Sequence, residues 1–406
     1  MSAKAGAPVL RSSSWSVEAW CGWVLVGAAP LVPVVGYLAP LGLAALVSLV
    51  GLLCLPALRI ADEDRPAAII LFAALIWAAV STTWSPYHPG KVGNMTIVKL
   101  ALELPLFWSA VSAGRRADPA LRTRALRVVA WGCALFGVVL IVEAATHAVI
   151  YKALHRLYQP IRDDLAESNV GHATQVLGLI WPLAAVSAAP RLRAWFALAM
   201  FVGTGAAALA FGYDSSMLGL VLAPLAAAVA WRWPRGGPRA MALATAALFL
   251  ATPFAVWAVR HFLDYEAIRS SLPRTDSMRL GYWSHAIDWI GDRPLRGWGL
   301  DASRMFGPGI ILHPHNNPLQ IWLELGAVGA VAAAAFWGVT LGRLARPEPS
   351  LAIAATIACA MAYLLFGVNF GIWQDWWLAL GVLVAMLSVM NVAEEAGRRT
   401  AQGRIA

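Results

Sequence analysis

Apolar stretches separated by short polar turns run along most of this chain. Stretches of about 17 to 25 apolar residues are typical of helices that cross a membrane. We therefore predict an all-α polytopic membrane protein with about twelve transmembrane helices, in a single membrane domain over residues 1–406. The predicted spans are 18–36, 38–57, 66–84, 93–113, 126–147, 169–188, 194–212, 216–231, 240–259, 317–342, 350–369 and 373–391.

Composition agrees with a lipid environment. Of the 406 residues, 60% are hydrophobic and 13% are charged, which is more apolar surface than a water-soluble domain buries. The 20 tryptophans fit membrane interfaces, where indole rings gather. The 4 cysteines lie in apolar runs without metal-ligand spacing, so we expect them to pack in the core. The formal net charge of +9 does not indicate nucleic acid, because the arginines are distributed as in a membrane protein.

The positions of the basic residues predict the orientation in the membrane. With a cytoplasmic N-terminus, the short inner turns and the C-terminal tail carry most arginines, as the positive-inside rule requires. These are Arg115, Arg116, Arg122, Arg124, Arg127, Arg191, Arg193, Arg232, Arg235, Arg239, Arg343, Arg346, Arg398, Arg399 and Arg404. We expect both termini in the cytoplasm and a retained first span, since no small-residue cleavage site follows it. Two longer segments, 148–168 and 260–316, then lie outside.

The larger outer segment, 260–316, is rich in arginine. Long loops escape the positive-inside rule, so a solvated surface is one interpretation. The other is an anion site, because the planar guanidinium group donates paired hydrogen bonds to phosphate. The arginines concerned are Arg260, Arg269, Arg274, Arg279, Arg293, Arg296 and Arg304.

Residues 276–291 favour the anion site, because they predict an amphipathic helix with Arg279 in its apolar face. An arginine in that position can reach a phosphate carried by a lipid at the membrane surface. The polar face would hold Ser277, Ser284, His285 and Asp288, and the apolar face Met278, Tyr282, Trp283, Ala286, Trp289 and Ile290.

The stretch HPHNNPLQIW, residues 313–322, places two histidines at the mouth of a predicted span. Pro314 disfavours helical backbone at His313, so both histidines are expected in extended or turn backbone. The positive end of the following helix favours a neutral imidazole at His315 and attracts phosphate. A neutral imidazole suits a general base.

The helix itself is expected to begin with a capping box. Asn317 is the predicted N-cap, Pro318 the first helical residue, and Gln320 the residue that completes the box. A histidine in this position is also compatible with a cap or an interfacial polar residue. The spacing of His313 and His315 suits a metal as well, but no third ligand is near, so we expect no metal.

Few charged side chains fall within the predicted spans. Lys99 and Glu103 are four residues apart on one helix and are expected to pair with each other. Glu143 and Glu324 have no obvious partners in the sequence. The outer acidic pair Asp163-Asp164 is expected to be solvated, with cation binding as the less favoured interpretation.

The same stretch resembles a known signature. His315-Asn316, followed after nine residues by Gly326-Ala327-Val328-Gly329, is similar to the H-[NSQ]-x9-G-x-x-G pattern of bacterial O-antigen ligases. The stretches WSPYHPGK at 84–91 and MRLGYWSHAIDWIGDRPLRGWGLDAS at 278–303 also resemble the wider O-antigen ligase and polymerase superfamily.

The resemblance implies a GT-C-like fold and a metal-independent, inverting glycosyltransferase without cofactor, in the bacterial inner membrane with a periplasmic site. Such enzymes transfer a polysaccharide from undecaprenyl pyrophosphate to a sugar of lipid A-core. O-antigen polymerases and protein O-oligosaccharyltransferases are the related alternatives. An anion transporter is less favoured, because the polar residues gather at one face and not at the bilayer midplane.

Site residues follow from the resemblance. The essential histidine would be His315 and the loop arginine Arg279. Members of the superfamily commonly carry Ser-Arg near the start of a mid-chain span, but YDSSMLG at 213–219 has no arginine. A second pyrophosphate-binding arginine would then come from elsewhere. The further substrate-binding candidates are His313, Asn316, Arg156, Arg162 and Arg274.

Overall fold

The structure is a computed structural model that describes residues 16–157, 159–343 and 348–403. Arg346, Arg404 and the side chains of Arg398 and Arg399 lie outside this description. The described residues form helices joined by turns and loops, with no strand among them. The helices are α1 (Val17–Ala28), α2 (Leu31–Leu38), α3 (Leu43–Leu53), α4 (Arg65–Ser81), α5 (Thr96–Arg116), α6 (Pro119–Thr146), α7 (Val149–His155), α8 (Asp163–Val186), α9 (Arg193–Ala210), α10 (Asp214–Arg232), α11 (Gly236–Phe262), α12 (Tyr265–Ser271), α13 (Arg274–Asp292), α14 (Asn317–Gly342), α15 (Pro349–Val368) and α16 (Asp375–Gly403).

The prediction of an all-α polytopic membrane protein is confirmed. Within the described residues, 10 helical segments are long and apolar enough to cross a membrane. Two of the predicted spans differ from these. The span 38–57 corresponds to a shorter apolar helix, Pro40–Leu53, and the span 169–188 falls in α8, whose polar residues exclude it from the ten.

Helix α8 lies at the centre of the bundle although it is more polar than the ten membrane-spanning segments. It packs against α6, α9, α15 and α16, and most of its side chains are buried. It begins at Asp163, six residues before the predicted start at 169, and α7 occupies part of the predicted outer loop. The expected loop 148–168 is therefore mostly helical, with a short linker between α7 and α8.

Outward-facing side chains are apolar. Phe72 on α4, Leu135 on α6 and Leu243 on α11 are 67%, 64% and 72% exposed. Such a surface is unfavourable in water and favourable against lipid tails, so these helices are suited to a bilayer.

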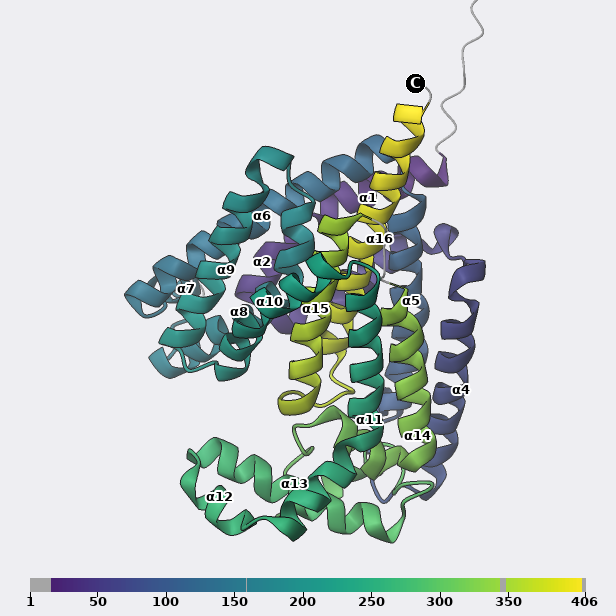
Figure 1. The fold of residues 1–406 in the computed structure, drawn as a ribbon, viewed down its shortest axis with the longest axis vertical. Helices are drawn as coiled ribbons and strands as arrows, with labels where there is room; N and C mark the ends of the chain where they lie inside the picture. Colours follow the sequence, from purple (N-terminus) through teal and green to yellow (C-terminus); the bar gives the residue numbers. More distant parts are fainter. Residues whose placement is uncertain (1–15, 158, 344–347, 404–406) are drawn as a thin grey trace, which may run out of the picture.

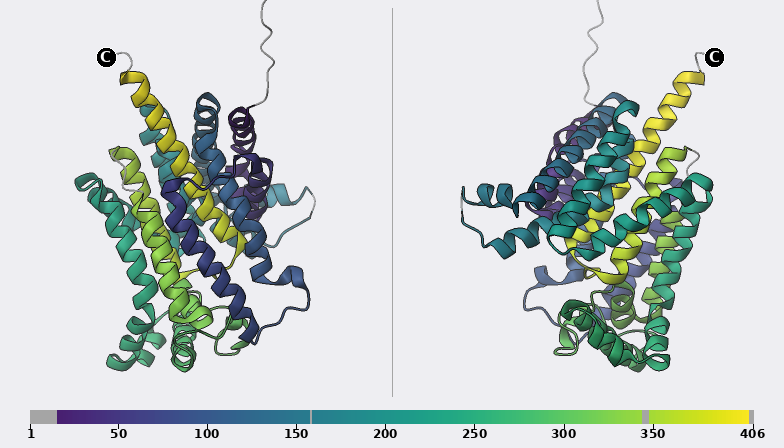
Figure 2. Two further views of the ribbon diagram at one scale, coloured as in Figure 1. Left: turned by 90° about the vertical axis from the view of Figure 1, so that its right-hand side faces the viewer. Right: turned by 60° about the vertical axis from the view of Figure 1, so that its left-hand side comes forward.

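The two ends of the bundle differ. Helix α16 ends at one end of the bundle. The α12–α13 segment lies at the opposite end, next to the C-terminal end of α11 and the N-terminal end of α14 (Figure 1). Helices α11 and α14 pack along each other, and α13 contacts both of them. Helix α7 projects from the side of the bundle, apart from α12 and α13 (Figure 2).

Candidate active site at the mouth of α14

Helix α13 presents the predicted amphipathic face to the protein. Tyr282, Ala286 and Ile290 are 9%, 0% and 6% exposed, whereas Met278, expected on the same face, is 41% exposed. The Trp283 indole Nε1 donates to the carbonyl oxygen of Pro314 at 2.9 Å. The helix is thus fixed directly to the segment that carries the two histidines.

His313 and His315 form one compact unit before α14. The φ angle of His315 is +52°, a left-handed turn that folds the chain back on itself. The backbone N–H of His315 donates to His313 Nδ1 at 3.2 Å, and the ring centroids are 4.2 Å apart. The His313 ring packs on the backbone at Gly371, where an added Cβ would lie 2.9 Å from the ring.

Helix α14 begins where the sequence predicts, but its cap differs. Asn316, and not Asn317, is the N-cap, and its Oδ1 accepts from the backbone N–H of Leu319 at 2.9 Å. Asn316 Nδ2 donates to the Gly367 carbonyl at 2.7 Å. The predicted capping box is wrong, because the Gln320 side chain points into the protein toward Glu324. Asn316 is 3% exposed with both polar groups engaged, so it has a structural role.

The helix is interrupted at Gly326, the first glycine of the motif. Its φ of 66° and ψ of −164° lie in a region that is nearly restricted to glycine. The carbonyl oxygens of Leu323 and Glu324 accept from the backbone N–H groups of Trp298 and Gly299, at 2.9 and 2.8 Å. These carbonyls would otherwise bond within the helix, so the loop after α13 replaces the missing helical hydrogen bonds.

The loop also accepts bonds from the far side of the break. The backbone N–H of Ala327 donates to the carbonyl of Pro294 at 2.8 Å, and that of Val328 to Leu295 at 3.4 Å. A Cβ at Gly326 would lie 2.3 Å from the carbonyl oxygen of Leu295. The loop after α13 and the middle of α14 are therefore in close backbone contact.

Both histidines have lowered pKa values. Burial, then the neighbouring His315 and Arg304, lowers the pKa of His313 to about 3. Burial, then the Arg279 guanidinium, lowers the pKa of His315, while a hydrogen bond with the Asn369 backbone raises it. The lowered pKa favours the neutral imidazole expected at His315, and burial, not the helix end, is its largest cause. A pKa of about 3 makes His313 a weak base, so His315 is the better general base.

Arg279 and His315 are brought together. Arg279 lies on α13 with 28% of its side chain exposed and pairs with Asp276 at 3.2 Å. Its guanidinium is close enough to lower the pKa of the His315 imidazole. Arg274 lies exposed at the first residue of the same helix.

Arg156 and Arg162 lie elsewhere, at the linker between α7 and α8. Arg162 forms an exposed ion pair with Asp164. Helix α7 packs on α6 and α8, away from the α12–α13 segment (Figures 1 and 2). The geometry therefore places Arg279 near the histidines and Arg274 at the start of the same helix, and it leaves the other two arginines apart.

Several polar contacts within the bundle were not expected from the sequence. Lys99 pairs with Asp375 on α16 at 3.3 Å, so the predicted pair with Glu103 is wrong. Glu143 accepts from the backbone N–H groups of Ile150 and Tyr151 at the start of α7.

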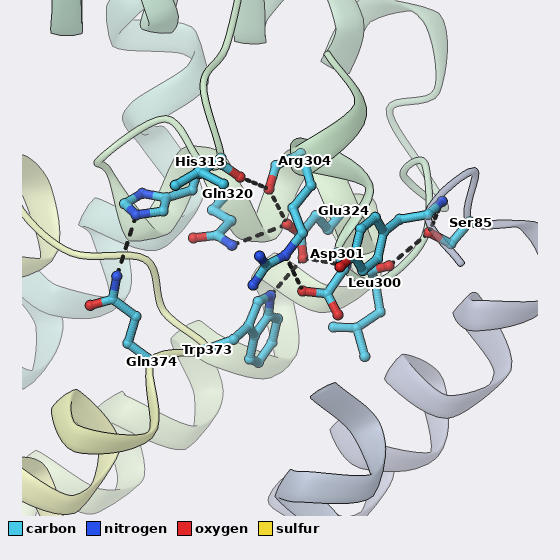
Figure 3. A network of polar contacts seen from close by, with 12 residues as sticks. Ser85, Leu300, Asp301, Arg304, His313, Gln320, Glu324, Trp373 and Gln374 are labelled. Atoms are coloured by element: carbon cyan, nitrogen blue, oxygen red, sulfur yellow. Dashed lines mark hydrogen bonds and ion pairs between the residues drawn. The ribbon is translucent and has the colours of Figure 1, made fainter. Parts of the chain in front are cut away.

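Glu324 accepts hydrogen bonds from four partners (Figure 3). One indication of this network was visible in the sequence, because a carboxylate on a predicted membrane helix requires polar partners.

A family model matches the part of the chain that contains these residues. Residues 196–334 match the family model described as O-antigen ligase. This segment of the chain is therefore similar to the O-antigen ligase family. The matched range runs from α9 into α14 and includes α13, both histidines and the glycine at the helix break.

Curated relatives are similar to part of the chain as well. A protein of Rickettsia conorii, named as a candidate polysaccharide ligase, is 32% identical over 129 residues, which are 28% of this chain and 31% of that protein. A similarly named protein of Rickettsia prowazekii is 31% identical over 129 residues, 28% of this chain and 32% of that protein. The alignments thus span about a third of the length of these relatives.

Proposed function

We propose that this protein is an O-antigen ligase that transfers a polysaccharide from undecaprenyl pyrophosphate to a sugar of lipid A-core. The observation that carries the proposal is the position of a half-buried imidazole, His315, at the mouth of a membrane helix and against α13, whose Arg279 guanidinium lies near enough to lower the pKa of that imidazole. One group can accept a proton, and the other can hold a diphosphate.

The reaction proceeds in one displacement. His315 accepts the proton of the acceptor hydroxyl while its oxygen attacks the anomeric carbon of the donor sugar. The bond between that carbon and the diphosphate oxygen breaks on the opposite face, and the diphosphate leaves with the electron pair. The configuration at the anomeric carbon is therefore inverted. No nucleotide is needed, because the diphosphate is already a good leaving group.

Arg279 stabilises the charge that develops on the leaving diphosphate. Asp276 holds the guanidinium on one side, and the partial burial of Arg279 strengthens its electrostatic contribution. Arg274 lies at the start of the same helix and is the nearer candidate for a second diphosphate contact. Arg156 and Arg162 remain proposals for contacts with a more distant part of the lipid-linked donor.

The site is proposed to face the periplasm of the bacterial inner membrane, with both termini in the cytoplasm. Two observations support this orientation. The short turns predicted to be cytoplasmic hold most of the arginines, and the α12–α13 segment lies at the end of the bundle opposite the end of α16 (Figure 1). The donor diphosphate would then lie at the outer membrane surface.

The decisive experiment supplies purified protein with lipid-linked glycan and one of three acceptors, which are lipid A-core, a second lipid-linked glycan and a protein. Transfer to lipid A-core, with release of undecaprenyl pyrophosphate, is the expected result. Extension of a second lipid-linked glycan would instead identify a polymerase, and transfer to a protein hydroxyl an oligosaccharyltransferase. If no acceptor receives sugar from the donor, glycosyl transfer is the wrong chemistry for this site.

A further inference from the structure

The buried carboxylate of Glu324 is linked by hydrogen bonds to the segments around the two histidines. Glu324 is two turns into α14 and is 0% exposed. Its Oε1 accepts from the Ser303 hydroxyl at 2.6 Å and from Gln320 Nε2 at 3.0 Å. Its Oε2 accepts from the backbone N–H of Asp301 at 3.0 Å and from the Trp373 indole at 2.6 Å. Each carboxylate oxygen therefore receives two donors (Figure 3).

The donors come from three segments of the chain. Asp301 and Ser303 belong to the loop after α13, Gln320 to α14, and Trp373 to the turn between α15 and α16. One carboxylate thus joins all three segments around the mouth of α14. A charge in this position is costly in a membrane protein, and its four hydrogen bonds offset that cost.

Two of these segments also contact the histidine unit, and the third, α14, directly follows it in the chain. The Ser303 hydroxyl is shared between Glu324 and the carbonyl oxygen of Leu312, which directly precedes His313. Gln374, next to Trp373, contacts His313 Nε2 at 3.5 Å. The segments bound to Glu324 are therefore those that fix the backbone and the ring of His313 (Figure 3).

His313 in turn fixes His315, since its Nδ1 accepts from the His315 backbone N–H. A route of direct contacts therefore leads from the carboxylate to the proposed base. Glu324 has no exposed surface and all of its partners are protein donors, so it does not touch substrate.

We propose that Glu324 is a positioning residue for His315, which acts by holding the segments around His313 together. This inference rests on the proposed function only for its catalytic readout. The role requires a carboxylate with two accepting oxygens, and an isosteric amide cannot replace it.

The polarity of the network explains why an amide fails. Gln320 Oε1 accepts from the backbone N–H of Ile372 at 3.0 Å, which directs Gln320 Nε2 toward Glu324. In one orientation an amide at position 324 would direct its NH2 group at the N–H groups of Asp301 and Trp373, which can only donate. In the other orientation it would meet the NH2 group of Gln320. Either way, buried donors are left unsatisfied.

An exchange of the two side chains restores the network. In the double variant Gln320→Glu with Glu324→Gln, the carboxylate at position 320 accepts from Ile372 and from the new amide. The amide oxygen at position 324 accepts from Asp301 and Trp373. The double variant keeps the charge and composition of the wild type, so it separates hydrogen-bond polarity from volume.

The test compares Glu324→Gln, the double variant and wild type by two measurements. The first is the rate at which diethyl pyrocarbonate modifies His315, determined by mass spectrometry at the residue level, which needs no enzymatic activity. The second is the pH dependence of kcat and the donor KM. In Glu324→Gln we expect faster modification of His315 and a kcat about 100-fold lower, with little change in KM. The acid limb of the kcat profile should move to higher pH, because His315 loses burial and its pKa rises. The double variant should restore all three.

Glu143→Gln is the matched control. Glu143 is also 0% exposed and accepts from two backbone N–H groups, those of Ile150 at 3.0 Å and Tyr151 at 2.7 Å, but it lies near the end of α6 and holds the start of α7. The same substitution there should lower stability without changing His315 modification or the pH dependence. If Glu324→Gln does not accumulate in the membrane, Ser303→Ala removes one donor and should change His315 modification in the same direction.

Two other outcomes have distinct meanings. Unchanged His315 modification in folded Glu324→Gln or Ser303→Ala, or a folded double variant that is not restored, overturns the positioning role. If the modification rates follow the expected pattern but wild-type protein transfers no glycan, the positioning role stands and the proposed function fails.

Discussion

The His315 ring lies nearly parallel to the Tyr282 ring, with 6.2 Å between their centroids and 19° between their planes. Tyr282 belongs to α13, which also carries Arg279. The same helix therefore covers the proposed base and supplies the proposed diphosphate ligand. A movement of α13 would change the burial of His315 and its distance from Arg279 together.

Replacing His315 by alanine should abolish transfer while the lipid-linked donor still binds. The imidazole acts on the acceptor proton, and loss of a general base costs about 10²–10⁴ in rate. The measurements are single-turnover transfer and donor binding to purified protein. His261→Ala is the control, because His261 is exposed and stacks on Trp257 with 4.5 Å between ring centroids. Near-normal transfer by His315→Ala would show that the motif only caps the helix and that His315 is not the base.

Replacing Arg279 by glutamine should shift the acid limb of the pH profile to higher pH. The pKa of His315 lies below its ordinary value of 6.5, partly because the Arg279 guanidinium disfavours the imidazolium. Without that charge the pKa rises, so the base becomes protonated, and activity is lost, at a higher pH. Burial remains and should keep the midpoint below the ordinary value.

Arg296→Gln is the control for this pH experiment. Its guanidinium lies over the Trp84 ring, 5.6 Å from the centroid, and it is not among the groups that shift His315. The midpoint is read relative to each variant's own plateau, because Arg279→Gln should also weaken donor binding. An unchanged midpoint in Arg279→Gln would argue that another group titrates.

Substituting alanine at Gly326 should destabilise the protein by about 1–3 kcal/mol, because the backbone conformation there is strained for any other residue. The new Cβ would also meet the Leu295 carbonyl at 2.3 Å. Gly338→Ala, in the same helix, meets its nearest neighbour at 3.8 Å and should be tolerated. Thermal unfolding in detergent measures the difference, and equal midpoints for the two variants would contradict the role of the break.

Reporter fusions test the orientation. A reporter fused after Arg116 or Arg235 should give a cytoplasmic signal, and one fused within 265–310 a periplasmic signal, because basic residues favour the inner side. A cytoplasmic signal from 265–310 would place the site on the wrong side for a lipid A-core acceptor.

The sequence was informative where a local pattern decides the structure. The spacing in 276–291 predicted α13 and its buried face, and the apolar run after Asn317 predicted α14. The cap was placed one residue late, since Asn316 and Asn317 are both suitable and only the backbone angles distinguish them.

Long-range partners were beyond the reach of sequence patterns. Spacing alone paired Lys99 with Glu103 on one helix, whereas the structure pairs it with Asp375, which is 276 residues away. The donors to Glu324 likewise come from residues 301, 303 and 373 as well as from its own helix. A spacing rule reports neighbours within one element, and contacts between distant elements depend on how the helices pack.

The backbone exchange at Gly326 has a consequence for how the site assembles. Helix α14 completes its hydrogen bonding in lipid only when residues 294–299 fold back onto it. The loop and the core of the helix therefore form one cooperative unit, which opens as a whole or not at all. Cleavage of the chain between α13 and α14 should accordingly loosen a helix in the middle of the bilayer as well as the surface where sugars would bind.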